Sequence, residues 1–143
     1  MESGLVNKTE KDFESIKHMV KNYGKFNNYG YRGLYNGETA KDIADRKGIS
    51  EKEDILDYMS STELAANLFR ITQTDEVLKN KNINNENDAC ITHHKVGQAV
   101  RQTIKRIGGT MPEDLPTPSK SAKQIEEEAK KQIKINDKKR YKK

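Results

Sequence analysis

The sequence predicts an all-α protein, a small bundle of about five or six helices. Apolar residues recur at intervals of three and four almost throughout the chain, and no alternating strand pattern extends beyond a few residues. Several short motifs are also typical of helix starts and stops. The chain has 143 residues, 32% of them hydrophobic, and a mean hydropathy of −1.04, which is material for one modest core. We expect a helical domain over residues 1–118, followed by a charged C-terminal helix or tail over residues 119–143.

The first 37 residues combine one predicted helix with a segment rich in glycine and tyrosine. A helix capped by Thr9 would carry four apolar residues on one face: Phe13, Ile16, Val20 and Tyr23. Residues 23–37 then hold four Gly and four Tyr, with Phe26 among them. Glycines at this density predict a loop of turns, and its rings predict an aromatic mini-core that docks the loop on the helices. The alternative is a surface that stacks bases or binds a partner protein, with candidate residues Tyr29, Tyr31, Arg32 and Tyr35.

Residues 39–59 predict two short helices joined by a tight turn. The helix over residues 39–47 is expected to end at Gly48, in the C′ position that favours glycine. Ser50 and Glu53 have the spacing of a capping box, which predicts a second helix through residues 55–59. The pair is similar to a helix-turn-helix unit, but its second helix carries four carboxylates that DNA phosphates would repel: Glu51, Glu53, Asp54 and Asp57. We therefore favour a structural helical hairpin over a DNA-reading unit.

Two longer helices are predicted in the second half of the body. Ser60 and Glu63 form another capping box, and the helix they start carries an apolar stripe of Leu64, Leu68, Ile71 and Leu78. Turn-forming residues at 80–87 break it. A further helix begins at Asp88 and ends at Gly108 and Gly109. Its predicted inner side consists of Ala89, His93, Val96, Val100, Ile104 and Ile107.

All three prolines fall within residues 109–118, so this segment is predicted to be an extended strap rather than a helix. Met111 and Leu115 are its expected apolar anchors. Ser119 or Ser121 then caps a last helix of low hydrophobicity, with isoleucines at 125, 133 and 135. This helix begins acidic and ends basic, a polarity that suits the helix dipole.

The net charge of +5 resides in the tail. Residues 119–143 hold ten Lys/Arg against four Asp/Glu, whereas the remaining residues hold 17 basic and 18 acidic side chains. Such a tail is commonly a solvated arm, and the alternative is a contact with nucleic acid or an acidic partner. The candidate residues for that contact are Arg70, Arg101, Lys105, Arg106, Lys138, Lys139 and Arg140.

The sequence offers no convincing catalytic or metal site. Cys90 and His94 share a helical face, with Asp88 and His93 nearby, but two ligands on one helix make a weak zinc or catalytic site. We therefore expect no enzyme activity, no catalytic residues, no cofactor and no metal. A single cysteine, no apolar run long enough to span a membrane, and no signal-peptide pattern after Met1 predict a cytoplasmic protein that does not contact membranes.

Several blocks of the sequence resemble a known family. The most specific are STELAAN at residues 61–67 and GGTMPEDLP at residues 108–116, and further similar blocks lie at residues 31–37, 39–43, 46–48, 73–74, 92–93, 96–97 and 100–104. Together they resemble the C-terminal half of the DNA-damage-inducible protein D family, over roughly residues 29–128, with the core of the likeness at 29–118. The family's antirepressor-like N-terminal half is expected to be absent, since residues 1–28 are too short to supply it.

The resemblance implies a non-enzymatic regulator in the bacterial DNA-damage (SOS) response. Such a protein would modulate recombination or repair by binding a recombinase–DNA filament or DNA itself. The alternative is a protein–protein module, encoded by a phage or mobile element, that inhibits or modulates a host protein through the Gly/Tyr segment and the strap. Exposed apolar stripes on several helices also leave room for a homodimer.

Overall fold

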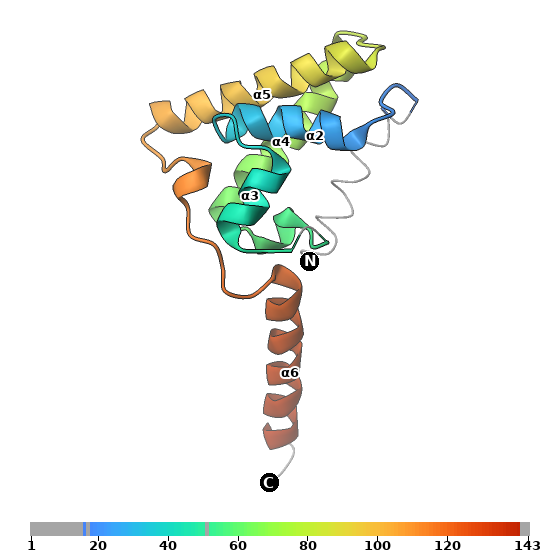
Figure 1. Cartoon of the computed structure of the whole chain (residues 1–143). Helices are drawn as coiled ribbons and strands as arrows, with labels where there is room; N and C mark the ends of the chain where they lie inside the picture. The colour runs from blue at the N-terminus through green and yellow to red at the C-terminus, as the bar shows by residue number, and fades with distance from the viewer. Residues whose placement is uncertain (1–15, 17, 51, 141–143) are drawn as a thin grey trace.

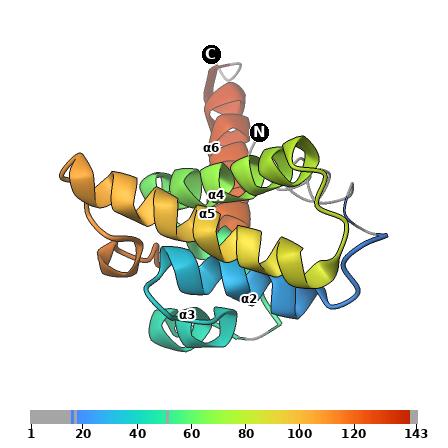
Figure 2. The same cartoon turned by 90° about the horizontal axis from the view of Figure 1, so that it is seen from above.

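The computed structural model describes residues 16, 18–50 and 52–140, which form helices and connecting segments without a strand. Four helices gather into one body, and a fifth projects from it into solvent (Figures 1 and 2). The predicted all-α class and small helical bundle are thereby confirmed. None of the described helices combines the length and apolar character that crossing a lipid bilayer requires.

The body consists of α2 (Tyr23–Leu34), α3 (Ala40–Lys47), α4 (Ser61–Asn80) and α5 (Glu86–Arg106). Two 3-10 turns, η1 (Ile55–Tyr58) and η2 (Pro112–Asp114), lie in the connecting segments, and the projecting helix is α6 (Ala122–Arg140). The start of the predicted first helix, at Thr9 and Phe13, lies outside the described residues. Ile16 and Val20 from its expected face are buried in the body.

The prediction of a loop in the Gly/Tyr segment is wrong, because most of the segment forms helix α2. Asn22 caps it by accepting a hydrogen bond from the Lys25 amide. The glycines permit α2 to lie directly against α5, with both helices running in the same direction (Figure 2). A Cβ on Gly30 would collide with the His93 ring, and one on Gly97 would lie 2.7 Å from the Gly30 carbonyl oxygen. The close crossing therefore outweighs the low helix propensity of glycine.

Two apolar clusters fill the body. One joins α2 and α3 to the segment before α4, and includes Leu34, Tyr35 and Ile43. The other lies at the opposite end of α2, where Phe26 packs near Cys90. Both clusters take aromatic side chains from α2, so the predicted mini-core exists, although it is built on a helix rather than a loop. Burial raises the pKa of the Cys90 thiol above its ordinary value.

The predicted helical hairpin of residues 39–59 is half right. Helix α3 has a Thr39–Asp42 capping box and ends at Gly48, whose φ of 70° lies in the left-handed region. The second helix is missing, since only the single 3-10 turn η1 follows, capped by Asp54. The Ser50 hydroxyl accepts a hydrogen bond from the Lys52 amide, which makes a local turn instead of a helix cap. The described residues between 39 and 59 therefore do not form a helix-turn-helix unit.

The two long helices follow their predicted bounds closely. Ser60 caps α4 by accepting from the Glu63 amide, and Asn85 caps α5 in the same way through Asp88. The side chain of Glu63, however, does not return to the cap but is buried in the body. The prediction for the far end of α5 is wrong at Ile107, which is 76% exposed instead of facing the core.

The strap after α5 is extended, as its prolines predict, apart from η2. Pro112 is its buried residue, whereas Met111 and Leu115 are only half-buried. At its end, Ser121 caps α6 in a reciprocal pair of hydrogen bonds with Gln124. The first turn of α6 rests on η1, where the Lys123 amide donates to Asp57 at 3.2 Å.

Candidate binding surface at the end of α5

A chain of buried polar side chains runs through the middle of the body. Lys47 donates to Glu63 at 2.7 Å, and both side chains are fully buried. The Tyr35 hydroxyl donates to the other Glu63 oxygen at 2.5 Å and accepts from the Asn67 amide at 2.9 Å. Asn67 in turn accepts from Arg70 at 3.0 Å. The chain thus connects α3, the end of α2 and α4, and each member is hydrogen-bonded, although Nε of Arg70 is buried without a hydrogen-bond partner.

Arg70 is the most deeply buried cation of the candidate set, at 1% exposure. Its guanidinium lies 4.7 Å from the centre of the Tyr31 ring and hydrogen-bonds to Nε2 of His93. Because a guanidinium only donates, Nε2 accepts, and Nδ1 donates to the Phe26 carbonyl at 2.9 Å. Burial and the Arg70 charge hold the pKa of His93 well below its usual value, so the ring is neutral.

The prediction of Arg70 as a surface cation is therefore wrong. Tyr31 and Tyr35 are also buried, so they cannot serve as a partner-binding loop. Tyr29 is half-buried with its ring edge against His94, which leaves Arg32 as the exposed member of that predicted set. The physical reason is that α2 turns these rings inward, where they shield the Arg70 charge.

Arg101 fastens the strap to the body. It forms a bidentate pair with Glu113 at 2.7 and 2.8 Å and donates to the Leu34 carbonyl at 3.1 Å. The hydrogen bonds from Arg101 lower the pKa of Glu113. Arg101 thus makes three hydrogen bonds within the protein, which makes it a strap anchor rather than an open site for phosphate.

An apolar groove opens between α4, the last turns of α5 and the strap. It holds about 250 Å³. Phe69, at 53% exposure, and Ile107 stand at its rim. Its principal apolar lining residues are Ala66, Phe69, Val100, Ile104, Ile107 and Leu115. An open groove with an exposed aromatic ring is the type of surface that binds a bulky apolar side chain of another molecule.

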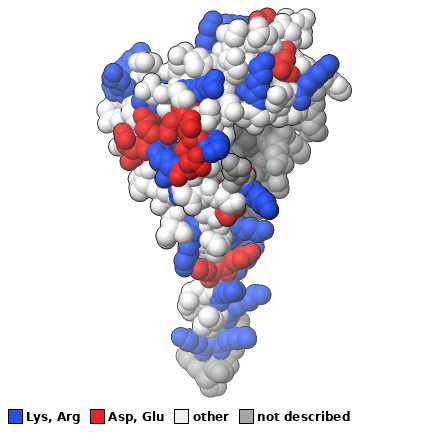
Figure 3. All heavy atoms as spheres, viewed as in Figure 1, with Lys and Arg blue, Asp and Glu red and all other residues white. Residues whose placement is uncertain are grey.

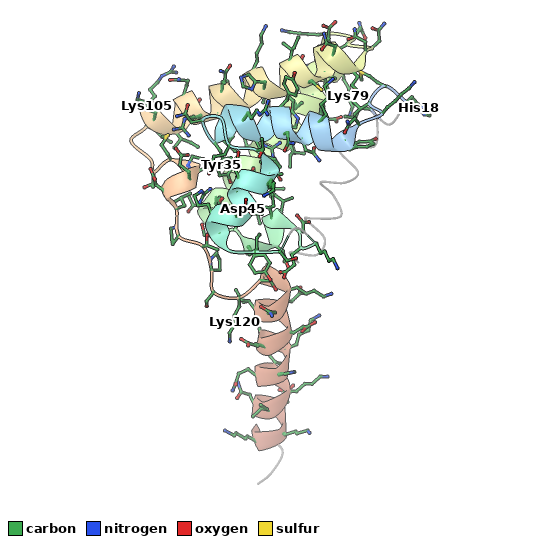
Figure 4. All side chains as sticks on the ribbon, viewed as in Figure 1. His18, Tyr35, Asp45, Lys79, Lys105 and Lys120 are labelled. Carbon is green, nitrogen blue, oxygen red and sulfur yellow. The ribbon has the colours of Figure 1, made fainter. Side chains whose placement is uncertain are left out.

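Two of the predicted cations lie at this end of α5. Lys105 and Arg106 occupy its last turn, are exposed, and make no salt bridge with another residue that the structure describes (Figure 4). The helix C-terminus attracts cations, so their position also has a structural benefit. Their charges nevertheless stay available to a ligand beside the groove.

The C-terminal cations do not join this surface. Lys138 and Lys139 are exposed in the outer part of α6, and Arg140 is its last residue. The outer part of α6 points away from the body, while Lys105 lies on the opposite side of it (Figure 4). Figure 3 shows Lys and Arg side chains on the body and along α6 toward its tip. The predicted shared basic surface is therefore divided into two distant parts.

The histidines and the cysteine are not brought together as metal ligands. His93 is occupied by Arg70 and Phe26, His94 hydrogen-bonds through Nδ1 to the Tyr29 carbonyl at 3.1 Å, and Cys90 is buried. No group of three candidate ligands occurs in the part of the chain that the structure describes.

Phe69 and Ile107 are the site residues that sequence reasoning missed. Phe69 follows Leu68 of the predicted stripe and so lies off that stripe, which is a usable signal for exposure. Ile107 gave no such signal, because its spacing fits the inner side of α5 and only the turn at residues 107–109 carries it outward.

Comparison with known proteins places the chain in a family. The family described as DinD C-terminal domain matches residues 11–125. The chain belongs to the DinD C-terminal domain family. It is 54% identical over 114 residues to the DNA damage-inducible protein D of Escherichia coli strain K12, an alignment that covers 80% of this chain. The chain spans 40% of the length of that relative. No solved structure matches it.

Proposed function

We propose that this chain is a non-enzymatic binding module of the DNA-damage response that docks on a recombinase–DNA assembly through the end of α5. The name of its Escherichia coli relative supports a link to DNA damage. The observation that carries the proposal is the pairing of an open apolar groove with exposed cations. Phe69 and Ile107 provide an anchor for a protein side chain, and Lys105 and Arg106 provide charges for phosphate.

The 3-10 turn η1, which stands where a recognition helix would lie, favours attachment to phosphates over contacts with base edges. Two cations at one helix end suit contacts to the DNA backbone, which add affinity without reading sequence. Binding is therefore expected to be weak on bare DNA, strongly dependent on salt, and tighter on DNA coated with a protein that fills the groove.

The decisive experiment is a titration at two salt concentrations of bare single-stranded DNA, bare duplex, and single-stranded DNA coated by a bacterial recombinase. The variant K105E/R106E is expected to weaken binding to each and to reduce the salt slope by about two, because two phosphate contacts are lost. Lys52 is an exposed lysine on the loop before η1, and K52E serves as the charge control. Equal weakening by K52E would show a general charge effect and refute the assignment to α5.

A second candidate function is a protein–protein module that modulates a host protein without contacting DNA. The exposure of Phe69 and Ile107 beside the strap favours it. In that case F69A would abolish binding to the recombinase in the absence of DNA, while K105E/R106E would change it little. An exposed threonine on the same helix, Thr72, provides the matched control T72A.

A further inference from the structure

Helix α6 extends from the body with almost no tertiary support. Every residue from Glu127 to Lys139 is exposed, and the contacts with η1 involve its first turn (Figure 1). A polar helix of this length is only marginally stable in water, because helices in proteins depend on packing along an apolar face. The geometry thus leaves α6 as a helix whose packing partner is missing from the single chain.

The apolar face of α6 is present and bare. Ile125, Ala129 and Ile133 follow one another at intervals of four, so they form one stripe along the helix. Ile125 is 50% exposed and Ile133 is 59% exposed, whereas Ile135, at 47%, is two residues from Ile133 and so lies on a different face of the helix. The two isoleucines of this stripe have no role in a solvated or DNA-bound arm, whereas a helix-to-helix contact would bury them.

The charges of α6 complement themselves end to end. Glu126, Glu127 and Glu128 form an acidic cluster in its first half, which also holds Lys123 and Lys130, and its second half is basic, with lysines at positions 131, 134, 138 and 139. Within the chain, Glu126 pairs with Lys130 and Glu128 pairs with Lys120. Figure 3 shows an acidic band on α6 with Lys and Arg side chains both on its body side and toward the tip. Two copies side by side in the same direction would place carboxylates against carboxylates. In opposite directions, the acidic cluster of each helix lies against the basic half of the other.

The segment beneath the first turn of α6, here called its foot, is also acidic. The η1 segment on which the helix rests carries Glu53, Asp54 and Asp57, and Asp57 accepts directly from the Lys123 amide. Nineteen residues of helix span about 28 Å at 1.5 Å per residue. In a full antiparallel overlap, Lys138 and Lys139 at one tip therefore reach the acidic foot of the other copy.

We propose that α6 pairs antiparallel with α6 of a second copy of this chain, through the stripe of Ile125, Ala129 and Ile133. This pairing does not depend on the proposed function, because it uses a different surface from the end of α5. A polyanion is a poorer occupant of this face, since the three glutamates would repel it and the isoleucines would stay exposed.

Sedimentation equilibrium of the full chain over a wide concentration range tests the pairing. We expect a monomer–dimer equilibrium, with at least a tenfold higher Kd for I125S/I133S and for E126K/E127K/E128K. The control I91S changes an isoleucine of similar exposure on α5 and is expected to leave the Kd unchanged. Circular dichroism of each variant at low concentration shows whether its body is folded. A monomer at every concentration, or a dimer that I125S/I133S does not weaken, overturns the proposal.

The direction of pairing requires a separate measurement. A spin label on K139C lies about eight residues from the middle of α6, so antiparallel pairing separates the two labels by roughly 25 Å. A parallel pair would bring the labels together at the shared tip. A short distance in electron–electron double resonance would therefore refute the antiparallel arrangement, and a long distance would support it.

Discussion

Glu63 is the residue on which the buried polar chain depends. Its two carboxylate oxygens accept hydrogen bonds from Lys47 and Tyr35, and it supplies the negative charge beside the buried cation Lys47. Lys47 also donates to Thr117 of the strap at 3.1 Å. The position thus links α4 to α2, α3 and the strap, although its spacing after Ser60 indicated only a capping box.

Glu63→Gln is expected to destabilise the protein by about 3 kcal/mol, because it leaves the Lys47 charge buried without a counter-charge. Urea unfolding followed by circular dichroism measures the change. Glu76→Gln, on the exposed side of the same helix, should shift the free energy of unfolding by less than about 0.5 kcal/mol. Equal effects of the two substitutions would contradict the role given to Glu63.

His93 makes stability depend on pH. Its pKa in the folded protein is well below the ordinary value of 6.5. Below pH 6.5 the unfolded chain therefore binds a proton at this residue, whereas the folded chain does not until the pH approaches the lower pKa. The stabilisation is complete above pH 6.5 and is lost as the pH falls toward the folded pKa. We expect a loss on the order of 1 kcal/mol per pH unit below that point. In urea unfolding at several pH values, substitution of the exposed His18 by Asn should leave this slope unchanged, whereas His93→Asn should flatten it.

At the scale of the element, the crossing of α2 and α5 reverses the usual effect of glycine. Gly33→Ala places a Cβ against the His94 carbonyl and 3.0 Å from the Gln98 nitrogen, both on the rigid backbone of α5. We expect a loss of about 2 kcal/mol or more. Gly24→Ala, in the same helix but 3.6 Å from its nearest neighbour, should instead stabilise by about 0.5 kcal/mol. Thermal unfolding of both variants checks the opposite signs.

The elements also show which features a sequence can predict. The caps at Ser60, Gly48 and Ser121 were predictable because a cap is formed by residues within one turn. Helix α2 was not, because its glycines are explained only by their close contacts with His93, His94 and Gly97 of α5, far along the chain. Local propensity therefore gave the wrong answer where a long-range contact determines the structure.

The candidate site also divides into residues whose exposure the sequence predicts and residues for which it does not. Lys105 and Arg106 were predicted from their place at a helix end, and they are exposed. Arg70 is a similar cation in a similar helix, but it is buried because its neighbours on one helical face, Glu63 and Asn67, carry a hydrogen-bonded chain inward. The sequence pattern shows that residue 70 is charged, but it does not show the partners that decide whether the side chain is buried.

At the scale of the whole molecule, the body and α6 are expected to behave as separable units. Removing residues 125–143 keeps the Ser121 cap and the Lys123 contact with Asp57. The free energy of unfolding of the remaining chain should lie within about 1 kcal/mol of that of the full chain, because the deleted residues are mostly exposed. Urea unfolding of both chains tests this, and a truncated chain that fails to fold would show that α6 stabilises the body.

The single cysteine has a practical consequence for such measurements. Cys90 is completely buried, and its thiol is held in the protonated, unreactive form. A maleimide dye should therefore react with a newly introduced surface cysteine and leave the native thiol untouched in the folded protein. Wild-type chain that takes up dye only in denaturant would make Cys90 an internal reporter of unfolding, with no need to engineer it away.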